Sequence, residues 1–156
     1  MLKKITITIF CLILLSGCNN KVETEKNTYL DVKKELEKTS NFTAGENLPC
    51  DIEIHLERKD PEEINYVLTL SNPKENMNTL KILLIHNQYT EDIFPNYGLL
   101  NDKAPSLTTN SEDKITIKNS ISSTNDIKSL NIEFRLLLEY TTDTDQTKTY
   151  YYKTTI

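Results

Sequence analysis

The chain has 156 residues, a length that suits a single domain. Charged residues make up 26% of it, and the formal net charge is −5 at pH 7. The acidic balance leaves no basic stripe for phosphates, so we do not expect nucleic acid as a partner, and anionic lipids would repel the chain. Only three glycines occur, which excludes a glycine-rich loop that cradles phosphate.

The first residues have the order of a secretory signal. Two lysines near the start are followed by an apolar run over residues 5–15, and two small residues then lead into Cys18. A helix that spans a membrane needs roughly 20 apolar residues, and this run is shorter. The sequence therefore predicts a segment that directs export and is then removed.

The tetrapeptide Leu15-Ser16-Gly17-Cys18 resembles the lipobox of bacterial lipoproteins. The resemblance implies that residues 1–17 are a lipoprotein signal peptide that is cut off, and that Cys18 carries a diacylglyceryl and N-acyl anchor. The protein would then stay at the extracytoplasmic face of the cell membrane. Each buried methylene of an acyl chain contributes about 0.8 kcal/mol to the free energy of membrane binding, and two or more chains anchor a protein stably. The alternative is a cleaved secretory signal that happens to contain a cysteine.

Removal of residues 1–17 leaves 139 of the 156 residues, and the loss of two lysines moves the formal charge from −5 to −7. Cys50 is then the only cysteine besides the lipidated one, so no intramolecular disulfide forms within the domain. Stability must come from an apolar core. We interpret Cys50 as an unreactive thiol at the start of a strand.

Residues 18–45 are highly charged and poor in large apolar side chains. We interpret them as a lipid-anchored linker with a possible short helix of two turns around Leu30 and Leu36. The folded domain is expected over residues 46–156.

From residue 51 onward the apolar side chains mostly recur with a period of two, which is typical of strands. The segment "LKILLI" is nearly continuous in apolar residues and indicates a strand buried on both faces. Proline and Asp/Asn clusters separate the segments. The strands are predicted over residues 51–58, 64–71, 80–87, 114–121, 130–142 and 148–156.

Six to seven strands with turn signals mostly every 8–12 residues indicate an all-β fold, an antiparallel immunoglobulin-like sandwich. The chain contains no tryptophan, so the Cys, Trp and Cys hallmark of antibody domains is missing. The prediction therefore concerns architecture. A small open barrel is the alternative.

The last predicted hairpin provides the candidate binding surface. A two- or four-residue loop would place Leu137 opposite Tyr152 and direct Tyr150 to the same outer face, which Arg135 shares. Tyrosine, arginine and exposed leucine are typical of interaction patches. The N-terminal linker could instead fold back over this face, and a five-residue loop would reverse every tyrosine assignment.

His55 and His86 are the only histidines. An envelope enzyme or metal-binding protein would require them to meet near carboxylates in one pocket. The sequence contains no hydrolase, zinc or phosphate-loop motif, and we expect no catalytic residue, no metal and no cofactor.

The sequence favours a lipid-anchored extracytoplasmic binding module of the bacterial cell envelope. Its expected partners are the membrane, through Cys18, and another envelope or exported protein. A protective or accessory lipoprotein belongs to this class. The alternatives are the histidine-based enzyme or metal-binding protein and a structural protein that self-associates.

Overall fold

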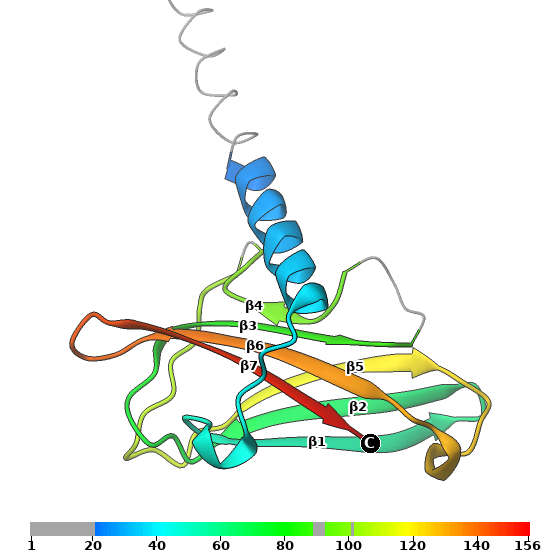
Figure 1. Ribbon diagram of the computed structural model, residues 1–156. Coiled ribbons are helices and arrows are strands. Elements are labelled where there is room, and N and C mark those ends of the chain that lie inside the picture. Colours follow the sequence, from blue (N-terminus) through cyan, green and yellow to red (C-terminus); the bar gives the residue numbers. More distant parts are fainter. Residues whose placement is uncertain (1–20, 89–92, 101) are drawn as a thin grey trace, which may run out of the picture.

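The computed structural model describes residues 21–88, 93–100 and 102–156. The predicted signal peptide and the lipid-bearing Cys18 lie outside the described residues. The described chain forms two antiparallel sheets packed face to face, with one N-terminal helix above them (Figure 1). The prediction of a mainly β sandwich is confirmed.

The three-stranded sheet has the order β1-β2-β5, and the four-stranded sheet has the order β4-β3-β6-β7. All six predicted strands are present, and β4 is a two-residue strand in a segment that was predicted only as a turn. The bounds are β1 (Asp51–Asp60), β2 (Glu63–Ser71), β3 (Asn78–His86), β4 (Asn96–Tyr97), β5 (Ile115–Ser122), β6 (Glu133–Thr141) and β7 (Thr147–Thr155), with short 3₁₀ helices η1 (Gly45–Asn47) and η2 (Ile127–Ser129).

The main core lies between the two sheets and is built from every second residue of each strand. Tyr66, Leu68 and Leu70 point inward from β2 and are fully buried. Phe134, Leu136, Leu138 and Tyr140 point inward from β6, as the alternating pattern predicts. The free thiol of Cys50 is buried in the same core, and burial raises its pKa to about 12.

Strand β3 is buried on both faces, as its continuous apolar run predicts. Leu80, Ile82 and Leu84 belong to the core between the sheets. Leu83 and Ile85 belong to a second apolar cluster on the opposite face of the sheet. The four-stranded sheet therefore needs a cover on its outer side.

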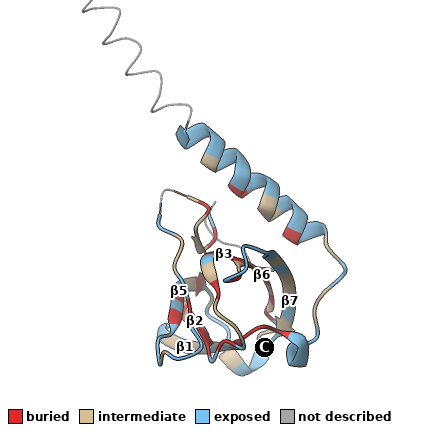
Figure 2. Ribbon diagram, turned by 90° about the vertical axis from the view of Figure 1, so that its left-hand side faces the viewer, coloured by how far each residue is buried: buried red, intermediate tan, exposed pale blue. Residues whose placement is uncertain are grey.

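The N-terminal helix provides this cover. It includes residues 21–38 and is longer than the two turns that the sequence predicts. Tyr29 and Leu36 are buried against the sheet, whereas Leu30 remains 47% exposed. Figure 2 shows that most of the helix is exposed and that a few buried positions interrupt it. None of the described helices is both long and apolar enough to cross a membrane.

The loop of the last hairpin has five residues, because Thr141 pairs with Thr147. Asp145 adopts a left-handed conformation (φ 58°), which aspartate tolerates in turns, and its N–H donates to the Thr142 carbonyl. The register is therefore one residue away from the predicted one. Leu137 lies opposite Tyr151, and Leu138 lies opposite Tyr150.

Candidate functional site

The four residues of the predicted patch do not form one surface. Tyr150 and Tyr152 lie on the inner side of β7 and pack against the core between the sheets. The Tyr150 ring stacks on Tyr140, with ring centroids 6.1 Å apart and planes 3° apart. The predicted outward orientation of both tyrosines is wrong, because the five-residue loop reverses the face on which each residue of β7 lies.

Arg135 and Leu137 do lie on the predicted outer face, but the N-terminal helix covers them. Leu137 is 4% exposed and shares a cluster with Tyr29 and Leu36 of the helix. The helix takes the place that the sequence assigns to an external partner. The alternative in which the linker folds back over this face is therefore the observed one.

Hydrogen bonds fix the position of the helix on the sheet. The backbone N–H of Phe94 donates to the Tyr29 hydroxyl at 2.9 Å, and burial raises the pKa of Tyr29. The Tyr151 hydroxyl donates to Glu35, and burial followed by this hydrogen bond raises the pKa of Tyr151 to about 12. Both hydroxyls therefore keep their protons near neutral pH, and the Tyr151 hydroxyl remains available as a donor to Glu35.

Arg135 links the C-terminal end of the helix to β6. Its Nη1 donates to the Glu37 carbonyl at 2.6 Å and to the Leu36 carbonyl at 3.4 Å. Its Nε donates to Glu133 at 2.8 Å, and this interaction holds the pKa of Glu133 below its usual value. The last carbonyls of a helix have no intrahelical partner and carry partial negative charge, so a guanidinium is a favourable cap.

Phe42 extends this arrangement beyond the helix. Its ring lies 5.6 Å from the Arg135 guanidinium carbon and 5.1 Å from Lys153 Nζ. Lys153 Nζ also lies 3.7 Å from the Glu133 carboxylate oxygen Oε2. Arg135 and Lys153 both lie close enough to the ring for cation–π attraction, which holds the segment after the helix against the sheet.

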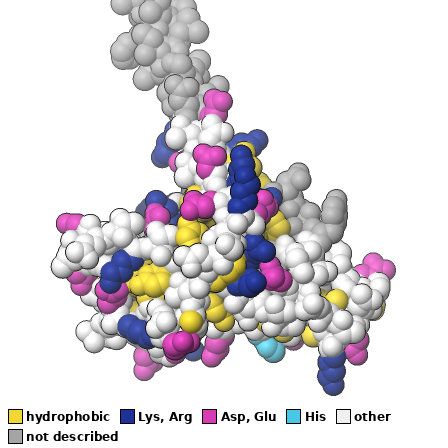
Figure 3. Space-filling model, in the orientation of Figure 1, with side chains coloured by type: hydrophobic (Ala, Val, Ile, Leu, Met, Phe, Trp, Pro, Cys, Tyr) yellow, Lys and Arg dark blue, Asp and Glu magenta, His cyan; other side chains and the backbone are white. Residues whose placement is uncertain are grey.

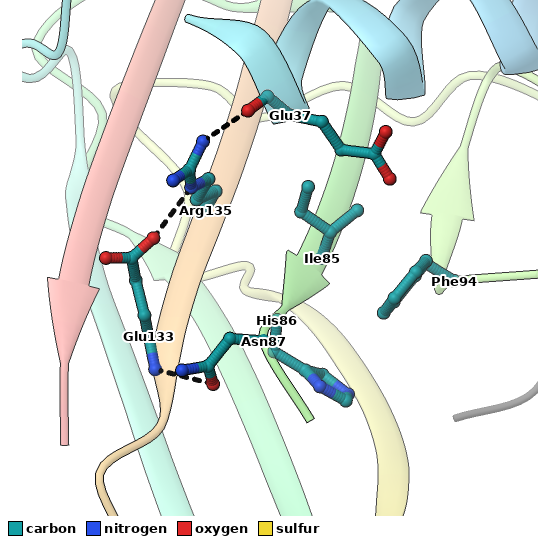
Figure 4. A pocket seen from close by; sticks show the side chains of 7 residues that line it. All are labelled: Glu37, Ile85, His86, Asn87, Phe94, Glu133 and Arg135. Carbon is teal, nitrogen blue, oxygen red and sulfur yellow. Dashed lines mark hydrogen bonds and ion pairs between the residues drawn. The ribbon is translucent and has the colours of Figure 1, made fainter. Parts of the chain in front are cut away.

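A pocket of about 230 Å³ opens beside this cap, where the helix ends and β3 ends (Figure 4). Ile85 and Phe94 supply apolar surface, and Arg135 and Glu133 supply opposite charges. Figure 4 shows the Arg135 guanidinium between Glu133 and the Glu37 carbonyl, so part of its hydrogen-bonding capacity is already used. The pocket is lined by Glu37, Ile85, His86, Asn87, Phe94, Glu133 and Arg135.

His86 and His55 do not meet. His86 is 7% exposed at the end of β3, and His55 is exposed on the outer face of β1 in the other sheet. The His86 ring meets Tyr66 and Phe94 edge-on, with centroids 5.3 and 5.2 Å apart. Its Nδ1 accepts from the Gln88 N–H, and its Nε2 has no hydrogen-bond partner among the residues that the structure describes. Burial lowers the pKa of His86 to about 4, so the ring is neutral at pH 7.

The described residues contain no group of three or more His, Cys, Asp or Glu side chains placed to hold a metal ion. Sequence reasoning missed Tyr151, Phe94 and Phe42, which position the helix. The signal for a covered outer face was present, because "LLL" in β6 and "LLI" in β3 place leucine or isoleucine on both sides of the sheet.

We expect the substitution Arg135→Ala to loosen the end of the helix. It removes the donor to two helix carbonyls and leaves Glu133 with one cationic neighbour, a loss of roughly 1–2 kcal/mol of docking free energy. Amide hydrogen exchange of residues 33–38 measures the loss as faster exchange. Lys59→Ala is the matched control, because it breaks an ion pair with Glu63 in the other sheet, away from the helix. Equal exchange in Arg135→Ala and wild type would contradict the capping role.

Comparison with known proteins adds no relative: no family model matches the chain, and neither a curated protein nor a solved structure matches it.

Proposed function

We propose that the protein is a lipid-anchored binding module on the extracytoplasmic face of a bacterial cell membrane. One observation carries the proposal: the N-terminal helix is docked on the sandwich by a buried apolar cluster, and its residue-21 end extends away from the domain (Figure 1). Cys18 precedes that end by three residues. An acyl anchor there would hold the sandwich beneath a helical stalk with a defined orientation.

We propose further that the sandwich has immunoglobulin-like topology. Its sheet orders, β1-β2-β5 and β4-β3-β6-β7, correspond to strands A-B-E and C′-C-F-G of such domains. The seven strands also follow one another in the chain order that this correspondence requires. Immunoglobulin-like sandwiches serve many binding functions, so this topology is compatible with the proposal and does not select a partner.

The surface offered to a partner is the outer face of the β1-β2-β5 sheet. This sheet lies on the far side of the sandwich from the helix, so an anchored molecule would turn it away from the membrane (Figure 1). Its outer side chains are polar or charged apart from Val67. A shallow pocket of about 330 Å³ on it is lined by Glu57, Lys59, Glu63, Asn65, Val67, Lys118, Asn119 and Ser120.

Flat surfaces of mixed charge are typical of transient contacts with proteins, whereas small ligands bind in deeper apolar cavities. On the face seen in Figure 3, acidic and basic side chains are likewise interspersed. We therefore propose another envelope protein or an exported protein as the partner, consistent with a protective or accessory role.

The substitution Cys18→Ser tests the anchor. We expect it to abolish acyl labelling and to release the protein from the membrane fraction almost completely, because the acyl chains supply the membrane affinity. Cys50→Ser is the matched control, since it alters the other cysteine of the processed chain and should leave labelling and retention unchanged. Retention of Cys18→Ser in the membrane fraction would contradict the proposed function.

A further inference from the structure

β1 is an edge strand of its sheet, and the 3₁₀ helix η2 also contacts it. It pairs with β2 along one side, and the described chain places no strand against its other side. It is ten residues long, whereas strands in globular proteins are most often about five or six residues. The unpaired N–H and C=O groups of a long edge strand are a template for pairing with another strand.

The side chains of β1 alternate over residues 51–58, and the pairing with β2 has an irregularity between Arg58 and Asp60. Exposed charged or polar residues occupy the outer face, and among them are Glu53, His55, Glu57 and Lys59. The inward residues Ile52, Ile54 and Leu56 pack on the core but stay partly exposed. Residues 52–56 carry no inward charge, and the next inward residue, Arg58, is charged but directs its guanidinium to the backbone carbonyls of Pro61 and Ser123.

We propose that β1 pairs antiparallel with β1 of a second copy of this chain, centred on Leu56. In this register Glu53 lies opposite Lys59 of the second copy, and His55 lies opposite Glu57. The opposite-charge pair of Glu53 and Lys59 contributes roughly 0.2–1 kcal/mol, and two-fold symmetry makes it occur twice. Lys59 then lies between Glu53 of the second copy and Glu63 of its own chain, which it contacts at 3.0 Å.

Neighbouring registers are unfavourable. In an antiparallel pair, opposite residues share a face only when the two-fold axis passes through a residue position. The neighbouring registers are therefore those centred on other residues of β1. Centring the pair on His55 sets Glu53 against Glu57, and centring it on Glu57 sets two copies of Glu57 against each other. Centring it on Ile54 sets Asp51 against Glu57. The Leu56 register alone among these avoids like charges in direct opposition.

The other edges are less suited to a second copy. On β7, the Thr43 N–H already donates to the Tyr151 carbonyl at 2.7 Å. β4 has two residues. The exposed side of β5 carries one charged residue, Lys118, so pairing with itself gains no opposite-charge contact.

The symmetry of this pairing fits a membrane-anchored protein, a step that rests on the proposed function. An antiparallel pair that continues one sheet has its two-fold axis perpendicular to that sheet. Both helices then extend from the same side of the joined sandwiches, and both anchors reach one membrane. Confinement to that membrane raises the effective concentration of the second copy.

Cysteine pairs test the register in the full-length protein in intact membranes. In the double variant Glu53→Cys/Lys59→Cys, opposite Cα atoms would lie about 4.5–5.5 Å apart, within disulfide range. The two positions within one strand are roughly 20 Å apart and cannot join each other. We expect a covalent dimer on mild oxidation. Thr116→Cys/Ser122→Cys, with the same spacing on β5, is the control that should stay monomeric.

A covalent dimer formed by His55→Cys alone, or no dimer from Glu53→Cys/Lys59→Cys, would overturn the Leu56 register. Charge reversal provides a second measurement. Glu53→Lys should weaken association by roughly 10-fold through its two symmetric pairs, and Glu53→Lys/Lys59→Glu should restore it in sedimentation of detergent-solubilised protein. A double variant as weak as the single one would contradict the pairing. Membrane retention is unaffected by any of these results, so failure of the dimer is distinct from failure of the anchor.

Discussion

The substitution Leu36→Asp is expected to detach the N-terminal helix and leave the sandwich folded. Leu36 is fully buried between the helix and the outer face of the four-stranded sheet, where a carboxylate would lose its hydration among apolar side chains. Losing a buried leucine costs about 3 kcal/mol, which corresponds to roughly 100-fold faster amide exchange over residues 21–38. Hydrogen exchange followed by mass spectrometry measures the exchange rate of the helix separately from that of the strands.

The interior of the sandwich should be spared, because Leu36 does not belong to the cluster between the sheets. Leu30→Asp is the matched control: it introduces the same charge into the same helix at a position that is 47% exposed. Its exchange should match the wild type. Collapse of the entire domain in Leu36→Asp would show that the helix is part of one cooperative unit with the sandwich.

The second large effect is a loss of folding stability at acidic pH, caused by His86. Burial lowers the pKa of His86 to about 4, whereas an unfolded histidine titrates near 6.5. Between these values the unfolded chain binds a proton that the native chain does not bind. The free energy of unfolding therefore falls as the pH drops from 7 to 4, by about 3 kcal/mol from this residue, and the contribution is fully lost below pH 4.

His86→Phe removes this titration and keeps an aromatic ring among Tyr66, Phe94 and Phe134. Urea unfolding at pH 7, 6, 5 and 4 should show a fall in stability that is about 3 kcal/mol smaller than in the wild type. Carboxylates such as Glu133 contribute equally to both proteins, so the comparison isolates His86. His86→Leu should behave in the same way. Identical pH profiles in wild type and both variants would contradict the buried neutral state.

The strands were predictable because burial on one face imposes a period of two on the sequence. β3 was also predictable as a strand buried on both faces, because its apolar run leaves no polar face. β4 was not, since two residues, Asn96 and Tyr97, are too few to show any period.

The helix and the hairpin register were harder to predict for physical reasons. Only Tyr29 and Leu36 are buried along the described helix, so its own pattern is weak, and packing on Leu83, Ile85 and Leu137 decides its position. The hairpin register depends on one residue of loop length, which the polar segment 142–147 does not specify. That single residue moves Tyr151 to the helix and Tyr150 to the core.

The Arg135 cap also determines how mechanical load enters the domain. A pull on the N-terminal end of the helix reaches Arg135 through the last helical carbonyls and passes into β6, which has strand neighbours on both sides. The force is thereby shared by the backbone hydrogen bonds that join β6 to β3 and β7. Only then does it reach β1 through the backbone that follows the helix. A pull on the helix would therefore load β6, a strand supported on both sides, before it could separate β1 from the edge of its sheet.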